Sequence, residues 1–185
     1  AREQPFAFYA VLDLEATCWE RGAAPDGFEA EVIELPAVLV DGRAGRAVAE
    51  FRTFVKPELW PQLSSYCTRL TGISQAEVDG APAFAEAAAR MLRWLEEQTS
   101  GDSVAFVTDG PWDLEVMLPA QWRLAHEDAE VPAVFQQYVD LRTVFRRTHP
   151  SRRTPRAGKL HKMCRALAID PVGPAHSGLA DARNA

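Results

Sequence analysis

The sequence has few cysteines and no long hydrophobic segment, and each of these absences excludes a class of protein. Its three cysteines, Cys18, Cys67 and Cys164, are odd in number and show no Cys-x-x-Cys spacing, which argues against a disulfide framework and a zinc site. No apolar run approaches the ~20 residues of a membrane helix, and residues 1–5 lack the apolar core of a secretory signal. We therefore expect an intracellular protein, cytoplasmic or nuclear, that makes no contact with a membrane.

Internal repeats and low-complexity segments are also absent, and the composition is that of a globular domain. Of the 185 residues, 47% are hydrophobic and 25% are charged, so one domain with a substantial core is expected. The formal net charge of −6 argues weakly against a nucleic-acid partner. Nine of the 20 Lys and Arg residues nevertheless lie between Arg142 and Arg165, where no acidic residue occurs. This segment is either a solvated surface or a patch for a phosphate backbone.

Two carboxylates interrupt an apolar run near the start of the chain. Asp13 and Glu15 lie within Ala-Val-Leu-Asp-Leu-Glu-Ala-Thr, residues 10–17. Residues i and i+2 of a strand point to the same face, so these side chains are expected side by side, roughly 7 Å apart. Partly buried carboxylates repel each other unless a cation compensates them, and hard divalent cations prefer carboxylate oxygens. The pattern predicts either a metal site or an edge strand with its acids in solvent.

Hydrophobic periodicity and turn signals predict a mixed α/β fold. Five strands are expected, the first three as an antiparallel meander, at residues 6–14, 31–40, 47–55, 103–108 and 138–141. Helices are expected at residues 63–70, 83–98 and 159–168. A short helix is expected to begin at Ser74, and another to follow the fifth strand and end at residue 147. A further helix is expected to run from residue 112 toward 126, with a kink or restart at Pro119. Residues 150–158 are expected to form a basic loop. This order predicts a mixed sheet flanked by helices.

Further acidic residues follow the fourth expected strand and close the chain. Asp109 and Asp113 both lie near a strand-to-helix turn, where sites collect in open sheets, and spacing alone does not choose between them. Asp113 is equally compatible with a simple helix cap. In the last segment, His176 is expected on a loop and Asp181 about one turn into a helix.

Taken together, these residues resemble a known family. Asp13-Leu14-Glu15, Trp112-Asp113, and His176 with Asp181 are similar, in order and type, to the three motifs of the DEDDh 3′–5′ exonucleases. These enzymes belong to the DnaQ-like, ribonuclease H-fold superfamily. Longer segments resemble the branch of enhanced-RNAi and histone-mRNA exoribonucleases, namely 13–18, 31–39, 63–73, 75–79, 107–114 and 176–184. The resemblance implies a single exonuclease domain over residues 1–185, ending within its last helix, with a ribonuclease H-like sheet and a monomeric state.

The resemblance also implies a reaction and a set of catalytic residues. The chain is expected to be a metal-dependent 3′–5′ exoribonuclease that hydrolyses single-stranded or short-overhang RNA from a free 3′-hydroxyl to 5′-nucleoside monophosphates. In the family the catalytic acid directly follows the aromatic residue, which favours Asp113 over Asp109. Two Mg²⁺ or Mn²⁺ ions would be held by Asp13, Glu15, Asp113 and Asp181. His176 would be the general base.

Substrate contacts are implied by the same resemblance. Ala16 and Thr17 would contact the terminal sugar, and Leu70, Thr71 and Ile73 would form a wedge against the last bases. Core packing is an equal alternative for Leu70 and Ile73. Trp112 could stack on a base, and the RNA backbone would follow the basic residues Arg152, Arg153, Arg156 and Lys159. Two other functions are compatible with the sequence, a DNA exonuclease of the same superfamily and a non-catalytic RNA-binding scaffold.

Overall fold

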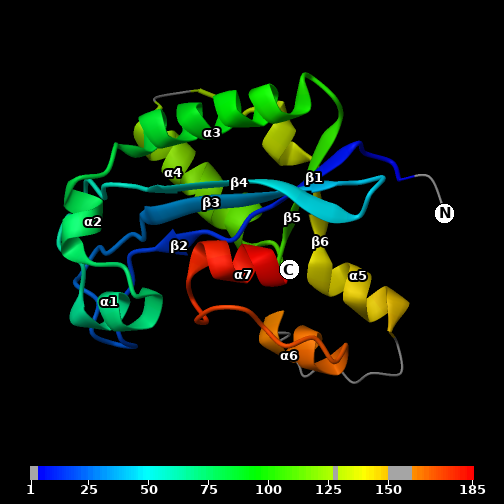
Figure 1. Cartoon of the computed structure of the whole chain (residues 1–185). Coiled ribbons are helices and arrows are strands. Elements are labelled where there is room, and N and C mark those ends of the chain that lie inside the picture. The colour runs from blue at the N-terminus through cyan, green and yellow to red at the C-terminus, as the bar shows by residue number, and fades with distance from the viewer. Residues whose placement is uncertain (1–3, 127–128, 150–159) are drawn as a thin grey trace.

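A computed structural model describes residues 4–126, 129–149 and 160–185 of the chain. Its strands are β1 (Phe8–Val11), β2 (Glu15–Ala16), β3 (Val32–Asp41), β4 (Arg46–Phe54), β5 (Val104–Thr108) and β6 (Tyr138–Asp140). Its helices are α1 (Ser65–Thr71), α2 (Gln75–Asp79), α3 (Phe84–Thr99), η1 (Trp112–Met117), α4 (Leu118–Ala125), η2 (Ala133–Gln136), α5 (Leu141–Thr148), α6 (Leu160–Ala166) and α7 (Gly178–Asn184). Figure 1 shows their arrangement. The expected basic loop at 150–158 lies outside the described residues.

The strands form one mixed sheet around β3. β3 pairs antiparallel with β1 on one side and with β4 on the other, which confirms the expected meander. β5 then joins β1 in parallel, and β6 joins β5 in parallel. The parallel part places the carboxyl ends of β1 and β5 at one edge of the sheet, which is where polar residues follow both strands.

Within the described residues the sheet has six strands rather than the five expected, because the first strand is interrupted. β1 ends at Val11, which pairs with Val38 of β3, and pairing resumes at Glu15, which lies opposite Glu34. The register between the two strands is therefore the same on both sides of the interruption. Between them, the main-chain N–H of Leu14 donates to a carboxylate oxygen of Asp113 at 2.9 Å. The ladder is therefore broken at the point where the chain binds an acidic side chain from a distant helix.

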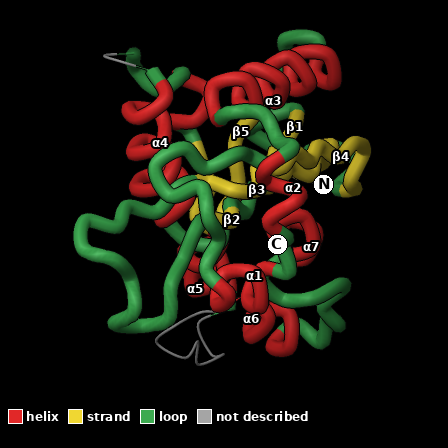
Figure 2. The backbone as a smooth tube through the Cα atoms, turned by 90° about the vertical axis from the view of Figure 1, so that its left-hand side faces the viewer, coloured by secondary structure: helices red, strands yellow, loops and turns green. Residues whose placement is uncertain are grey.

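Side chains along this interrupted strand point alternately to the two faces of the sheet, one face toward the main core and the other toward the acidic site. Ala10, Leu12 and Leu14 are buried in the main core with α3 and α4. Val11, on the opposite face, packs against Ala182 of α7. In Figures 1 and 2, α3 lies above the strands and α7 below them. Asp13 and Glu15 share the face of Val11, so the strand directs both acids toward α7.

Helix boundaries follow the local signals in the sequence. The Ser64 side chain caps α1, and Ser74 with Glu77 forms a capping box at the start of α2. The segment beginning at Trp112 starts as a π-helix and continues as an α-helix from Leu118, so the restart expected near Pro119 is confirmed. Among the described residues, no helix has the length and apolar character needed to cross a membrane.

Candidate active site

Four carboxylates from separate parts of the chain converge at the edge of the sheet. Asp13 lies in the interruption after β1 and Glu15 in β2, while Asp113 and Asp181 lie on η1 and α7. Glu15, Asp113 and Asp181 are buried and Asp13 is half-buried. A cavity of about 560 Å³ contains Asp13, Glu15 and Asp113 in its wall, and an adjoining cavity of about 360 Å³ contains Asp13 and Asp181. The expected acids therefore line two cavities that have Asp13 and His176 in common.

Asp113 and Asp109 have different surroundings. Asp113 accepts the Leu14 N–H described above, which links η1 directly to the Asp13–Glu15 segment. Asp109 instead forms a two-point ion pair with Arg142, at 2.8 and 3.0 Å, and accepts the main-chain N–H of Leu160 at 3.2 Å. The Asp109 carboxylate is thus engaged by a cation and a main-chain donor, while Asp113 faces the other acids.

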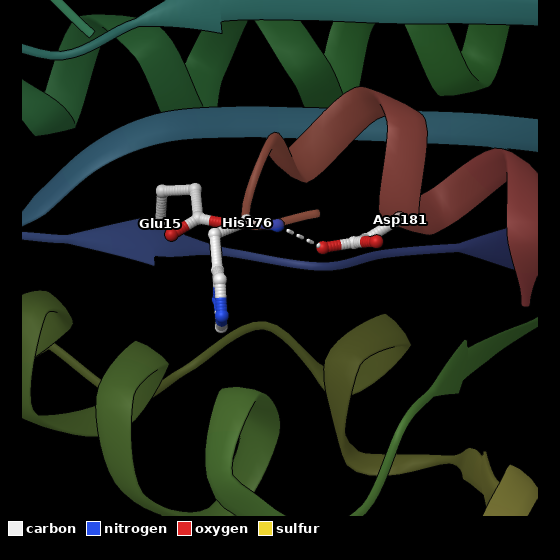
Figure 3. A group of neighbouring side chains, drawn as sticks. All are labelled: Glu15, His176 and Asp181. Carbon is white, nitrogen blue, oxygen red and sulfur yellow. Dashed lines mark hydrogen bonds between the residues drawn. The ribbon is translucent and has the colours of Figure 1, made fainter. Parts of the chain in front are cut away.

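Asp181 is held by two donors at its carboxylate. The main-chain N–H of His176 lies 2.7 Å from one oxygen, and Nε2 of His161 lies 3.1 Å from the other. One potential ligand atom each from Glu15, His176 and Asp181 lies within 4.8 Å of the other two. Figure 3 shows these three side chains together, with the N–H of His176 directed at Asp181. The close of the chain therefore brings both a histidine and an acid to Glu15.

His176 is exposed and lies on the loop before α7, as the sequence predicts. Its φ is +60°, in the left-handed region that residues other than glycine rarely adopt. The hydrogen bond from its N–H to Asp181 accompanies this conformation. Because the side chain lines both cavities, its imidazole is available to a molecule bound between the acids.

Burial and mutual repulsion perturb the acids strongly. Burial, followed by the charges of Asp113 and Asp181, raises the pKa of Asp13 to about 9. Burial and the neighbouring Asp13 charge raise the pKa of Glu15 to about 9. Burial also raises the pKa of Asp113 to about 6, although the hydrogen bond from Leu14 opposes the shift. Uncompensated oxygen donors of this kind fit hard divalent cations, which would relieve the repulsion.

Glu34 and Gly178 determine where α7 sits on the sheet. The Glu34 side chain is fully buried on β3 and accepts the N–H groups of Gly178 and Leu179, at 3.1 and 3.3 Å. It also pairs with Arg52 at 2.7 Å. A Cβ on Gly178 would lie 2.5 Å from the carbonyl oxygen of Asp13, so only glycine permits this approach.

An aromatic cluster contributes Trp19 and Phe28 to the wall of the larger cavity. Phe28 meets Trp19 and Trp60 edge to face, with ring centroids 6.3 and 5.7 Å apart. The buried carboxylate of Glu31 accepts the main-chain N–H groups of residues 58–60 at 2.6 to 3.1 Å, and so fixes the segment that carries Trp60. Trp112 also lines the cavity and is 44% exposed. The cavity therefore presents apolar rings next to the acids.

The residues expected to contact substrate lie in several environments. Ala16, Leu70 and Trp112 line the larger cavity. Thr17 lines it too, but its hydroxyl accepts the N–H of Glu31 at 2.9 Å. Thr71 and Ile73 are buried, and Ile73 packs with Cys67 and Val78. Four basic residues of the expected set lie outside the described part of the chain, namely Arg152, Arg153, Arg156 and Lys159.

Arg142, His161 and Glu34 contact the site, although the sequence predicts no role there for any of them. His161 lies in no recognisable motif, and Arg142 is only one of the residues of the basic segment. Each contacts an acid through tertiary packing, Arg142 with Asp109 and His161 with Asp181, for which no local signal exists. Glu34 did carry a signal, because a carboxylate inside the apolar run 32–40 is as unusual as Asp13 inside 8–14.

Comparisons with known proteins agree with this geometry. The family model described as "Exonuclease" matches residues 10–185. The chain is 35% identical to the 3′-5′ exonuclease Snipper of Drosophila melanogaster over 195 residues, which cover 98% of this chain and 67% of that protein. It is 34% identical to human ERI1 exoribonuclease 3 over 184 residues, covering 98% of this chain but 52% of the human protein.

A solved structure gives the same result in three dimensions. The nuclease domain of 3′hExo, described as a DEDDh family member bound to rAMP, superposes with a TM-score of 0.89 at 31% identity. The match covers 99% of this chain and 90% of that domain. The chain thus spans a nuclease domain, while it covers only about half to two thirds of the two curated relatives.

Proposed function

This chain belongs to the exonuclease family, among the DEDDh 3′–5′ exonucleases, and on that premise we propose that it removes nucleotides from RNA ends carrying a free 3′-hydroxyl. The proposal rests on the convergence of four acids and a histidine around the two cavities described above, namely Asp13, Glu15, Asp113, Asp181 and His176. Single-stranded RNA and short 3′ overhangs are the proposed substrates, and 5′-nucleoside monophosphates the products.

The four carboxylates are proposed to hold two divalent cations, Mg²⁺ or Mn²⁺. The all-oxygen donor set supports hard cations, and so do the raised pKa values of Asp13 and Glu15, which mark negative charge without compensation. When bound, such ions promote ionisation of water and offset the charge that develops on the phosphate oxygens. Asp181 is held for this role by His161 and by the N–H of His176.

His176 is proposed as the general base. Histidine is suited to accept a proton near neutral pH, and this imidazole lines both cavities beside Glu15 and Asp181. It would take a proton from the attacking water, whose oxygen forms a new bond to phosphorus. The bond from phosphorus to the 3′-oxygen of the preceding nucleotide then breaks. The phosphate leaves on the terminal nucleoside, and the shortened RNA keeps a 3′-hydroxyl.

The 3′-terminal nucleotide is proposed to occupy the larger cavity. Its base would stack on the exposed ring of Trp112, next to Leu70, because a flat apolar surface binds any base without reading its sequence. Its sugar would lie against Ala16 and Thr17. The solved 3′hExo domain was bound to rAMP, which supports binding of a nucleotide by this chain. The basic residues Arg152, Arg153, Arg156 and Lys159 would follow the backbone upstream.

A comparison of substrates tests the proposal. The chain is incubated with a 5′-labelled single-stranded RNA, its DNA equivalent and the same RNA ending in a 3′-phosphate, each with Mg²⁺ or with EDTA. We expect stepwise shortening of the 3′-hydroxyl RNA, which EDTA abolishes, with little cleavage of the other two. Equal shortening of DNA would favour a DNA exonuclease. Binding of RNA without metal-dependent cleavage of any polymer would favour a non-catalytic scaffold.

A further inference from the structure

Two of the three cysteines lie together beside the larger cavity. Cys18 follows β2, is half-buried and lines that cavity, whereas Cys67 is fully buried in α1. Both side chains belong to one apolar cluster with Ile33 and Ile73. Their two segments are 49 positions apart in the chain, yet α1 brings Cys67 into the cluster against which Cys18 packs.

A single hydroxyl holds the two cysteine backbones together. Ser64 Oγ donates to the carbonyl of Cys18 at 2.6 Å and accepts the N–H of Cys67 at 2.9 Å. The segment after β2 and the start of α1 are therefore pinned at the level of the main chain. A new bond between the two sulfurs would require little movement of either segment.

The surroundings of the two thiols differ. Cys18 lines the cavity, so small molecules in solvent reach the pair from its side. Interaction between the two thiols raises the pKa of Cys18 and lowers the pKa of Cys67 to about 7, with burial opposing the second shift. Because peroxides react with exposed and ionised thiols, solvent access favours oxidation of Cys18 and ionisation favours oxidation of Cys67. The Cys67 thiol also lies 3.7 Å from the carbonyl oxygen of Ala16, its hydrogen-bond acceptor.

From this geometry we propose that Cys18 and Cys67 form an oxidation-sensitive site that peroxides convert to a disulfide. Hydrogen peroxide oxidises one of the two sulfurs to a sulfenic acid and is reduced to water. The other sulfur then attacks it, the S–S bond forms, and the hydroxyl leaves as a second water. The sum is two thiols and one peroxide giving one disulfide and two waters. A dithiol reductant such as dithiothreitol reverses the reaction.

The disulfide changes the wall of the catalytic cavity. Once its sulfur is bonded to Cys18, Cys67 no longer has a proton to donate to Ala16. The segment that carries Ala16 and Thr17 also becomes tied to the helix that carries Leu70. This consequence, unlike the disulfide itself, rests on the proposed function. We expect RNA hydrolysis to fall roughly tenfold, because small misplacements of a substrate-positioning segment are costly.

Peptide mapping of the full chain tests the site. The reduced protein is treated with hydrogen peroxide, its remaining thiols are alkylated, and the fragments are identified by mass spectrometry. We expect a linked pair of fragments containing Cys18 and Cys67, with Cys164 still alkylated, and we expect dithiothreitol to remove the link. Cys164 is the internal control, because it is buried in a different cluster, between α6 and α7. Accumulation of Cys18 sulfinic acid with Cys67 still a free thiol would overturn the proposal.

Variants separate the disulfide from the proposed activity. Cys67→Ser should prevent the link and make hydrolysis insensitive to peroxide, while Cys164→Ser should leave both the link and the sensitivity intact. If the disulfide-linked protein hydrolysed RNA as fast as the dithiol form, the proposed effect on catalysis would be wrong. The oxidation-sensitive site itself would still stand. A reduced protein that never hydrolyses RNA would instead contradict the proposed function, and the mapping result would still stand.

Discussion

At the scale of single residues, the acids of the site are poised to bind either a proton or a metal ion. Asp13 and Glu15 have pKa values near 9, chiefly because burial disfavours their charged forms. Model carboxyls ionise near pH 4, so between about pH 4 and pH 9 the folded metal-free protein binds more protons than the unfolded chain. The free energy of unfolding contributed by these groups therefore falls as pH rises through this window.

We predict that, in EDTA, the melting temperature falls between about pH 5.5 and pH 8.5, and that Asp13→Asn flattens the fall. Addition of Mg²⁺ should raise the melting temperature more at the higher pH, where protons compete less with the metal. Thermal unfolding followed by circular dichroism measures both effects. Asp26→Asn, at an exposed acid outside the site, is the control. An equal effect of Mg²⁺ at both pH values would contradict this account of the acids.

His176 gives a second prediction at this scale. Replacement with Ala should lower turnover of RNA about a hundredfold or more, because general-base catalysis contributes that much. Mg²⁺ and RNA should still bind, since the four carboxylates remain and Asp181 keeps the main-chain N–H of residue 176. Single-turnover kinetics and calorimetric titration measure the two quantities. His149→Gln is the matched control, because His149 stacks on Phe145 away from the cavities. Unchanged turnover in His176→Ala would remove this residue from the mechanism.

Most residues of the site can be predicted from the sequence, and those that cannot be predicted have a physical reason in common. Asp13, Glu15, Asp113, Asp181 and His176 lie in short motifs, so they could be proposed from residue type and order. Arg142 and His161 could not, because each meets its acid only after α5 packs on β6 and α6 packs on α7. The resemblance favoured Asp113 over Asp109, and the structure places Asp109 in an ion pair with Arg142.

At the scale of elements, the position of α7 depends on a buried carboxylate. Glu34 accepts two N–H groups at the start of this helix and pairs with Arg52. We predict that Glu34→Leu destabilises the fold by about 1–3 kcal/mol, because buried donors lose their acceptor. It should also raise the Mg²⁺ concentration needed for half-maximal turnover, because Asp181 is carried by α7. Urea denaturation and a Mg²⁺ titration of the RNA hydrolysis rate measure these effects.

Glu50→Gln provides the comparison for Glu34. Glu50 binds Arg183 of the same helix at 2.8 Å, but both side chains are largely exposed. Its loss should cost at most about 1 kcal/mol and leave the Mg²⁺ requirement unchanged. If Glu34→Leu and Glu50→Gln behaved alike, the buried anchor would have no special role in placing Asp181.

Gly178 gives a steric prediction for the same helix. Gly178→Ala should destabilise the protein by about 1–3 kcal/mol, because the added methyl meets the Asp13 carbonyl at 2.5 Å and must displace α7. RNA hydrolysis should fall with it. Gly80→Ala is the control, since its Cβ would meet nothing nearer than 3.6 Å. Urea denaturation of both variants decides the point, and equal stability would show that α7 tolerates the shift.

Elements were predictable where the signal is local. The capping box at Ser74 and the apolar stripe of α3 identify their helices from sequence alone. The break between β1 and β2 was not predictable, because it depends on a hydrogen bond between Leu14 and Asp113, 99 positions along the chain. The alternation of side chains continues across this break, so Asp13 and Glu15 still share the face of Val11, while Leu14 binds Asp113.

At the scale of the whole molecule, the site exists only because the mixed sheet joins three distant segments. The segment from β1 to β2 supplies Asp13 and Glu15, η1 after the parallel strand β5 supplies Asp113, and α7, which carries Asp181, packs on β3. The fold class was predictable from the order of strands and helices together with the family resemblance. The depth of the cavity was not, because it depends on residues 17–31 and their aromatic packing.

The chemical form of the products tests the proposed exonuclease reaction. If water attacks phosphorus and the 3′-oxygen is the leaving group, as proposed, the phosphate stays on the released nucleoside and the RNA keeps a 3′-hydroxyl. Chromatography of the products from an unmodified single-stranded RNA, with Mg²⁺ present, should therefore give nucleoside 5′-monophosphates as the released species. Release of 3′-phosphates or 2′,3′-cyclic phosphates would mean that a ribose hydroxyl or another bond had reacted, and would contradict the account.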